Sequence, residues 1–212
     1  MVRAVSLVVA VLSGVSPVVA VAQHRTWLIN VTGGYSHGIG GDFGGGGSVS
    51  GTAAAFRPVG RIVDVGVELG YHGLGTNTTR LQDLYGPGST YQEDFTRRAW
   101  QATAAVRLHP AGSASRPYVS AGAGAYLVGF RDIIEVRDGA GQLIPQYQFR
   151  QSDSEVHPGV NLGLGVDRLV TIGRLGIGIH GRWHGVIAGG IGDFFSIGLG
   201  VALDAGRSGR QP

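Results

Sequence analysis

Charged side chains lie within segments of this chain whose alternate residues are Val, Leu, Ile or Gly. Asp64 and Glu68 fall inside Val63–Tyr71, and Arg107 and Arg182 fall inside similar segments further along. If these segments are strands, each charge lies on the face opposite the large apolar residues. A charge in a confined interior is costly unless it is paired. We therefore expect Asp64 to pair with Arg107, and Glu68 to meet Arg182 across that interior.

The polar residues on this face are predicted to form one network of ion pairs and hydrogen bonds that fills a barrel. Such a network would block conduction, whereas an ion gate or a solute path is the alternative interpretation of the same residues. The predicted members are Asp64, Glu68, Gln101, Arg107, Asn161, Asp167, His180 and Arg182, with His184 as a further member.

No residue spacing in the chain predicts a catalytic, metal or cofactor site. His180 and His184 are four residues apart, which suits two ligands on a helix but separates them widely on a strand. Gly44–Ser48 is glycine-rich but lacks the Lys of a phosphate-binding loop. We expect the histidines to be interior residues and the chain not to be an enzyme.

The elements that must position the charges are strands of alternating pattern. Val63–Tyr71 places Val, Val, Val, Leu and Tyr on one face and Asp, Gly, Glu and Gly on the other. An apolar outer face alternating with a small or polar inner face is typical of a transmembrane β-barrel. The eight predicted strands are Thr26–Ser36, Ser48–Arg57, Arg61–Gly73, Arg98–His109, Tyr118–Phe130, His157–Arg168, Arg174–Val186 and Phe194–Asp204.

The connections between these strands alternate in length. Short turns are expected at 58–60, 110–117 and 169–173, whereas 37–47, 74–97 and 131–156 are long, and 187–193 is intermediate. Bacterial outer-membrane barrels have short periplasmic turns and longer extracellular loops. The order predicts an antiparallel up-and-down barrel with both termini in the periplasm, and polar, flexible loops over 74–97 and 131–156.

Composition sets the compartment and the packing of the interior. Arg3, an apolar run and Ala20-Val21-Ala22 predict a cleaved signal peptide over residues 1–22, with an uncleaved membrane anchor as the alternative. The barrel is then 23–204, followed by a polar tail over 205–212. The chain has no Cys, and its net charge of +3 does not indicate a nucleic-acid partner. Its 39 glycines mostly alternate with apolar residues, which favours a narrow, filled barrel over a disordered chain.

Aromatic residues near the strand ends are predicted to form the girdles that sit at membrane interfaces. Ordinary core packing in a soluble barrel is the alternative. The periplasmic girdle would contain Trp27 and Tyr118, and the outer girdle Tyr35, Tyr71, Trp100, Phe130 and Trp183.

These patterns resemble the small eight-stranded outer-membrane barrels of the outer membrane protein A, X and W type and the related outer membrane beta-barrel domain families, over residues 23–204. The resemblance implies residence in the outer membrane, contact with its lipids and lipopolysaccharide, and insertion by periplasmic chaperones and the assembly machinery. Such barrels commonly end in an aromatic residue, whereas here Ala202-Leu203-Asp204 precedes the tail.

The predicted role is structural or in surface interaction, and three alternatives remain. The W-type barrels suggest a narrow channel for small or apolar solutes. Related barrels are lipid A-modifying enzymes; Ser36, His37 and Asp42 supply the residue types of one, while His184-Gly185-Val186 lacks the serine of another. A soluble lipocalin-like binder would bury the apolar face instead, so the face that is apolar separates it from a membrane barrel.

Overall fold

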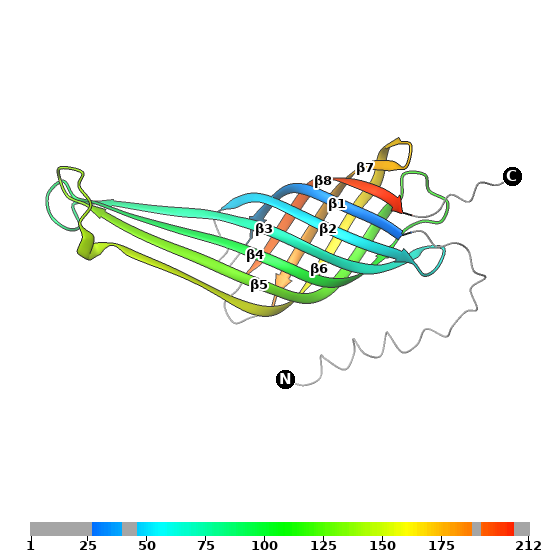
Figure 1. Cartoon of the computed structure of the whole chain (residues 1–212), viewed down its shortest axis with the longest axis horizontal. Coiled ribbons are helices and arrows are strands. Elements are labelled where there is room, and N and C mark those ends of the chain that lie inside the picture. Colours follow the sequence, from blue (N-terminus) through cyan, green and yellow to red (C-terminus); the bar gives the residue numbers. More distant parts are fainter. Residues whose placement is uncertain (1–26, 40–45, 188–191, 206–212) are drawn as a thin grey trace, which may run out of the picture.

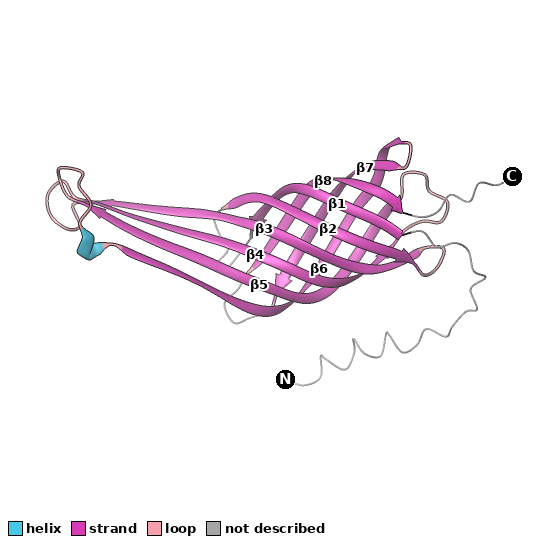
Figure 2. Cartoon of the chain, viewed as in Figure 1, coloured by secondary structure: helices cyan, strands magenta, loops and turns pink. Residues whose placement is uncertain are grey.

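The computed structural model describes residues 27–39, 46–187 and 192–205, which form eight strands and one short 3-10 turn, Pro145–Tyr147 (Figure 1, Figure 2). The signal peptide predicted over 1–22 lies outside the described residues, as does the tail beyond Ala205, which itself ends the last strand. The strands are β1 (Trp27–Gly38), β2 (Gly47–Pro58), β3 (Val63–Gln82), β4 (Thr90–Leu108), β5 (Pro117–Arg137), β6 (Phe149–Ile172), β7 (Leu175–Val186) and β8 (Asp193–Ala205).

The strands form a closed, antiparallel up-and-down barrel in sequence order, which confirms the predicted fold class. The seam between β1 and β8 pairs residues from Trp27 with Ala205 through to Gly38 with Phe194. β1 therefore begins, at Trp27, at the same end of the barrel where β8 ends, at Ala205. We call this the terminal end (Figure 1).

Four strands continue beyond the opposite end as an open sheet, which we call the extension (Figure 1). The prediction of loops over 74–97 and 131–156 is therefore wrong for most of their length. β3 and β4 stay paired out to Gln82 with Thr90, and β5 and β6 out to Ile134 with Phe149. The extension is rich in Thr, Ile, Phe and Tyr, which favour strands, but both its faces carry polar residues, so it lacks the one-sided pattern of the barrel wall.

A bulge marks the junction of barrel and extension on β3, between Gly73 and Thr76. Leu74 turns inward there and is 2% exposed. Gly75 adopts a φ of +91°, and a Cβ on it would lie 2.6 Å from the backbone of Gly46, so this position requires glycine.

One carboxylate of the extension is held ionised by one neighbour across the sheet and one on its own strand. Thr78 donates to Asp94 Oδ1 at 2.7 Å and Gln92 Nε2 donates to Oδ2 at 2.9 Å. These hydrogen bonds, from Thr78 first, lower the pKa of Asp94 below its usual value. A carboxyl with a lowered folded pKa contributes stability above its unfolded pKa, and this contribution is lost as pH falls through the folded pKa.

We therefore expect T78V to raise the pKa of Asp94. The pH at which the extension loses this contribution to its stability on acidification should rise with it. The matched control is T76V, because the Thr76 hydroxyl bonds Thr96 at 2.8 Å and not a carboxylate. Carboxyl 13C NMR titration of the protein in detergent micelles measures the pKa directly. An unchanged Asp94 pKa in T78V would contradict the assignment.

The outside of the barrel is apolar and the inside is not. Leu164 and Leu199 are 66% and 65% exposed, whereas the polar Glu68 and Asn161 are each 1% exposed. A water-soluble barrel would reverse this arrangement, so the structure disfavours the lipocalin-like alternative. Within the described residues, no helix is long and apolar enough to cross a membrane. Further exposed apolar residues of the wall are Ile29, Val31, Val49, Val67, Leu69, Val119, Leu162, Ile177, Ile179, Ile197 and Val201.

Two apolar clusters lie inside the barrel, one near the extension and one near the terminal end. Near the extension, Tyr126 and Phe194 are both fully buried, together with Leu74, Ala99 and Val186. Near the terminal end the cluster contains Leu28, Ala54, Phe56, Ala105 and Ala202. Glu68 therefore lies between two apolar clusters, whereas Asp64 lies nearer the terminal end than Phe56 does.

Candidate functional site in the barrel interior

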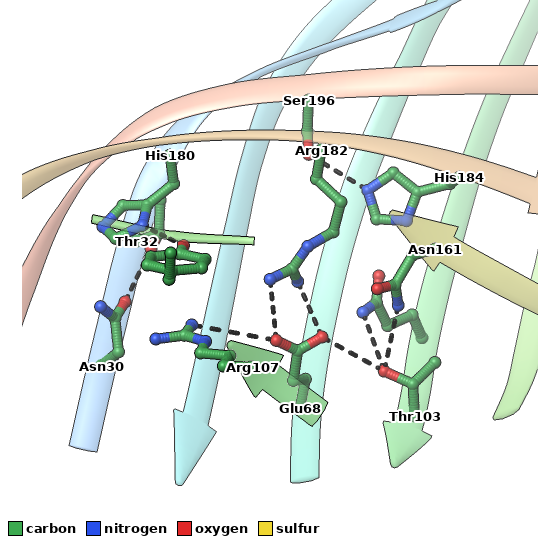
Figure 3. Close-up of polar contacts among 12 residues, drawn as sticks. Asn30, Thr32, Glu68, Thr103, Arg107, Asn161, His180, Arg182, His184 and Ser196 are labelled. Carbon is green, nitrogen blue, oxygen red and sulfur yellow. Dashed lines mark hydrogen bonds and ion pairs between the residues drawn. The ribbon is translucent and has the colours of Figure 1, made fainter. Parts of the chain in front are cut away.

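The centre of the interior is an ion pair that spans it. Arg182 of β7 binds Glu68 of β3 in a bidentate way, with Nη1–Oε2 and Nη2–Oε1 distances of 2.8 and 2.7 Å (Figure 3). The Glu68 side chain is completely buried, and Arg107 approaches its Oε1 to 4.0 Å. The pairing of Glu68 with Arg182 expected from the sequence is thus present, and it ties opposite walls of the barrel together.

Arg107 does not pair with Asp64, so the predicted Asp64–Arg107 pair is wrong. The two residues are opposite each other in the ladder of β3 and β4. Arg107, however, stacks between the rings of Phe56 and Tyr118, at 3.8 and 4.2 Å from their centroids. This stacking directs the guanidinium to Asp167 of β6, at 3.3 Å.

Asp64 instead belongs to an ionic cluster at the terminal end. Arg116 binds Asp64 at 3.1 Å and Asp204 at 3.6 Å, and Arg168 also contacts Asp204. His109 Nε2 lies 3.3 Å from Asp64. This cluster joins residues of the β4–β5 turn to β3 and to the last strand, and neither Arg116 nor His109 was predicted to take part.

Tyr118 lies inside the barrel, which corrects its predicted place in the aromatic girdle. It is 6% exposed, and its hydroxyl lies 2.5 Å from His180 Nδ1. The alternation of β5 places Val119 outward, so the residue before it must face inward. Trp27, Tyr35 and Trp100 are exposed.

The other predicted outer-girdle residues are at or near the end of the barrel beside the extension. Tyr71 packs against Trp100 with ring centroids 4.8 Å apart. Trp183 is half-buried and pairs with Phe195 of β8. Phe130 is stacked on Phe95 at the start of the extension.

A second polar chain lies nearer the extension. Ser36 Oγ and His72 Nδ1 are 2.9 Å apart, and His72 Nε2 lies 2.9 Å from Gln101 Oε1. His184 stacks on Phe194 with 9° between the rings and bonds Ser196 at 3.1 Å. His72 lies inside, as expected of the histidines and as the alternation that places Glu68 inside requires, whereas Ser36 was not predicted as an interior residue.

Ser36, His72 and Gln101 are hydrogen-bonded in the order in which a catalytic triad arranges its nucleophile, its base and the group that orients the base. Ser36 and His72, however, are both 0% exposed, so no substrate reaches the hydroxyl. His37 faces the other way and lies beside Phe195, with ring centroids 5.9 Å apart. Ser36 and His37 of the enzyme alternative thus lie on opposite faces of β1, and its third residue, Asp42, lies outside the described residues.

The remaining predicted residues complete the polar layer. Asn161 Nδ2 donates to Thr103 at 3.3 Å, and Asp167 accepts from Asn30 at 3.0 Å. Thr103 in turn donates to Glu68 at 3.4 Å. Across residues 27–39, 46–187 and 192–205, no three His, Cys, Asp or Glu side chains are grouped so as to hold a metal ion.

A cavity of about 30 Å³ lies within this layer, bordered by Asn30, Thr32, Arg107, His180 and Arg182 among others. A cavity of this size accommodates only one or two water molecules. His180 Nε2 and Arg182 Nε are buried without a protein hydrogen-bond partner, so both have capacity to bond water there.

No family model matches the sequence, and no curated protein sequence matches it. Several solved structures, among them the following three, are similar over most of the chain. Neisserial surface protein A is 13% identical, with 87% of this chain and 99% of that one covered and a TM-score of 0.42. The attachment invasion locus protein of Yersinia pestis is 11% identical, with 85% and 99% covered and a TM-score of 0.46. CarO of Acinetobacter baumannii is 15% identical, with 82% and 96% covered and a TM-score of 0.39.

Proposed function

We propose that this chain is an integral outer-membrane barrel whose interior is closed by its own side chains and whose extension serves as a surface for interaction. The observation that carries the proposal is the contrast between the two faces of the wall. Val, Leu and Ile cover the outside, while Glu68, Arg107 and Asp167 are buried inside and Arg182, which is partly buried, binds Glu68 there. A closed barrel satisfies its backbone in lipid, and its apolar wall requires lipid.

The interior supports a structural role more than a channel. Opening a path would require Arg182 to leave Glu68, and separating a buried pair costs several kcal/mol. The apolar clusters around Phe56 and Phe194 would also have to move. We propose that this barrel neither conducts ions freely nor transports a solute through its centre.

The extension presents a second surface, at its tip. Tyr85 and Tyr147 come from different hairpins and lie with ring centroids 4.5 Å apart. Aromatic residues that are exposed in a group are common at protein interfaces. The exposed large residues of the tip are Leu81, Leu84, Tyr85, Leu143, Tyr147 and Phe149, with exposures between 41% and 54%.

Maturation is part of the proposal. Cleavage after Ala22 would follow export, with periplasmic chaperones and the assembly machinery inserting the barrel among outer-membrane lipids and lipopolysaccharide. N-terminal sequencing of the protein from outer membranes is then expected to begin at Gln23.

Detergent extraction and electrophoresis test the membrane barrel itself. We expect the protein to require detergent, to migrate as a compact band without heating, and to shift on boiling. Reconstituted in planar bilayers, it is expected to give no sustained current. A chain that stays soluble without detergent would overturn the membrane assignment, and a sustained current would overturn the closed interior.

Shortening the extension tests the surface role separately. A variant in which tight turns replace residues 76–96 and 131–155 is expected to keep the heat-modifiable band, because the barrel pairs are all retained. Bacteria that carry it are expected to lose attachment to surfaces. The matched variant Y85S/Y147S isolates the tip; full attachment by both variants would count against the surface role.

A further inference from the structure

Three arginines lie in diagonal succession on the outward face of the extension. Arg98 of β4 is opposite Gly129 of β5, Arg131 is opposite Thr96 and Ser152, and Arg150 of β6 is opposite Ile133. Each arginine is exposed, and each is one strand over and two residues further out than the one before. Neighbouring positions of this kind bring long side chains within reach of one another.

These three guanidiniums have no carboxylate partner in the described part of the chain. Other arginines of the extension differ: Arg80 donates to Gln92 at 3.1 Å, and Arg137 binds Glu135 at 3.2 Å. Three like charges kept together without a counterion disfavour the isolated sheet, so an anion from outside the chain would stabilise them.

The surroundings of the three arginines suit phosphate. Thr96, Ser152 and Ser154 add hydroxyl groups to the same face. A Cβ on Gly129 would lie 3.4 Å from Arg98 Nε, so the Arg98 side chain extends across this glycine towards β6. Guanidinium groups bind phosphate oxygens in pairs, which a lysine ammonium cannot do, and every basic residue of the chain other than histidine is Arg.

The distance of the arginines along the strands from the apolar part of the barrel indicates which molecule would supply that phosphate. Trp100, on the same face of β4, is 54% exposed and lies two residues from Arg98, about 7 Å along the strand. Arg131 and Arg150 follow at further steps of about 7 Å. The first arginine is thus at the depth of lipid headgroups, and the other two lie just outside them.

We propose that Arg98, Arg131 and Arg150 bind the phosphate groups of lipopolysaccharide in the surrounding outer leaflet. The proposal rests on the proposed membrane location, and it adds a specific lipid site on the β4–β6 side of the barrel. Binding there would seat the extension in the layer of phosphorylated sugars and fix its direction relative to the membrane.

The test compares two triple variants in mixed micelles with purified lipid A. R98Q/R131Q/R150Q removes the cluster, and R57Q/R61Q/R174Q removes three exposed arginines near the terminal end with the same change of charge. We expect the first variant to bind lipid A about 100-fold more weakly, since each arginine near an anionic surface contributes on the order of five-fold. The control variant should bind as the wild type does, and dephosphorylated lipid A should bind weakly to all three proteins.

Other outcomes would overturn the proposal. Equal lipid A binding by the two triple variants would remove the site. Displacement of lipid A by millimolar inorganic phosphate would indicate a free-anion site, and preferential binding of a sulfated polysaccharide would indicate a glycan partner. The heat-dependent band shift, measured on the same samples, reports whether the barrel itself is folded, so failure of the lipid site and failure of the membrane barrel are distinguishable.

Discussion

E68Q is expected to destabilise the barrel by about 3–5 kcal/mol, because removing one partner of a buried ion pair leaves the other charge unpaired. The carboxylate of Glu68 accepts two hydrogen bonds from Arg182 and lies 4.0 Å from Arg107. In the variant, Arg182 keeps its charge inside the barrel without a carboxylate, whereas Arg107 retains Asp167. Urea unfolding of the protein in detergent micelles measures the loss.

The double variant E68Q/R182M separates the cost of an unpaired charge from the loss of a contact. Replacing both members of a buried pair is often nearly neutral. We therefore expect the double variant to recover most of the stability that E68Q loses. If E68Q and the double variant were equally unstable, the stability would depend on the shape of these side chains, and the ion pair would not be the reason.

G34A is expected to prevent closure of the barrel, and G33A is not. A Cβ on Gly34 would lie 2.5 Å from Gly198 Cα and even closer to the carbonyl oxygen of Ile197, both on the facing strand β8. Real Cβ atoms do not approach backbone so closely, so β1 and β8 would have to separate, at a cost of about 3 kcal/mol or more. Gly33, one residue earlier, has nothing within 4 Å of the same added atom.

Refolding yield into detergent micelles, read from the heat-modifiable band, compares these two variants. G33A adds a methyl group to the outer wall and should refold as the wild type does. G34A should remain largely in the heated position on the gel. Equal yields would mean that the β1–β8 seam can move apart to accept a side chain, and that the interior is less tightly filled than its glycines indicate.

Strand number, strand direction and the facing of Glu68 and Arg182 were predictable because a period of two assigns each residue to one side of a wall. The extension was not predictable, because its strands carry polar residues on both faces and therefore lack a one-sided apolar pattern. The partner of Arg107 was not predictable either. Register places it opposite Asp64, but stacking between Phe56 and Tyr118 selects the rotamer that reaches Asp167.

Tyr118 shows a different limit. It could have been assigned to the interior from the alternation of its own strand, since Val119 is its outward neighbour. Aromatic residues at strand ends are common at membrane interfaces, and that tendency outweighed the alternation for Tyr118. The alternation along a strand is the stronger guide to whether a residue lies inside or outside the barrel, because it follows from backbone geometry.

The pairing of β3 with β4 and of β5 with β6 limits how the length of the extension can change. Adding two residues to each strand of a hairpin would raise the tip by about 7 Å and leave every side chain on its present face. Adding one residue to each would turn the face that carries Phe95 and Phe130 outward and the face that carries Arg98 and Arg131 inward. Related chains with taller or shorter projections are therefore expected to differ by even numbers of residues per strand, or to carry a second bulge like that at Gly73.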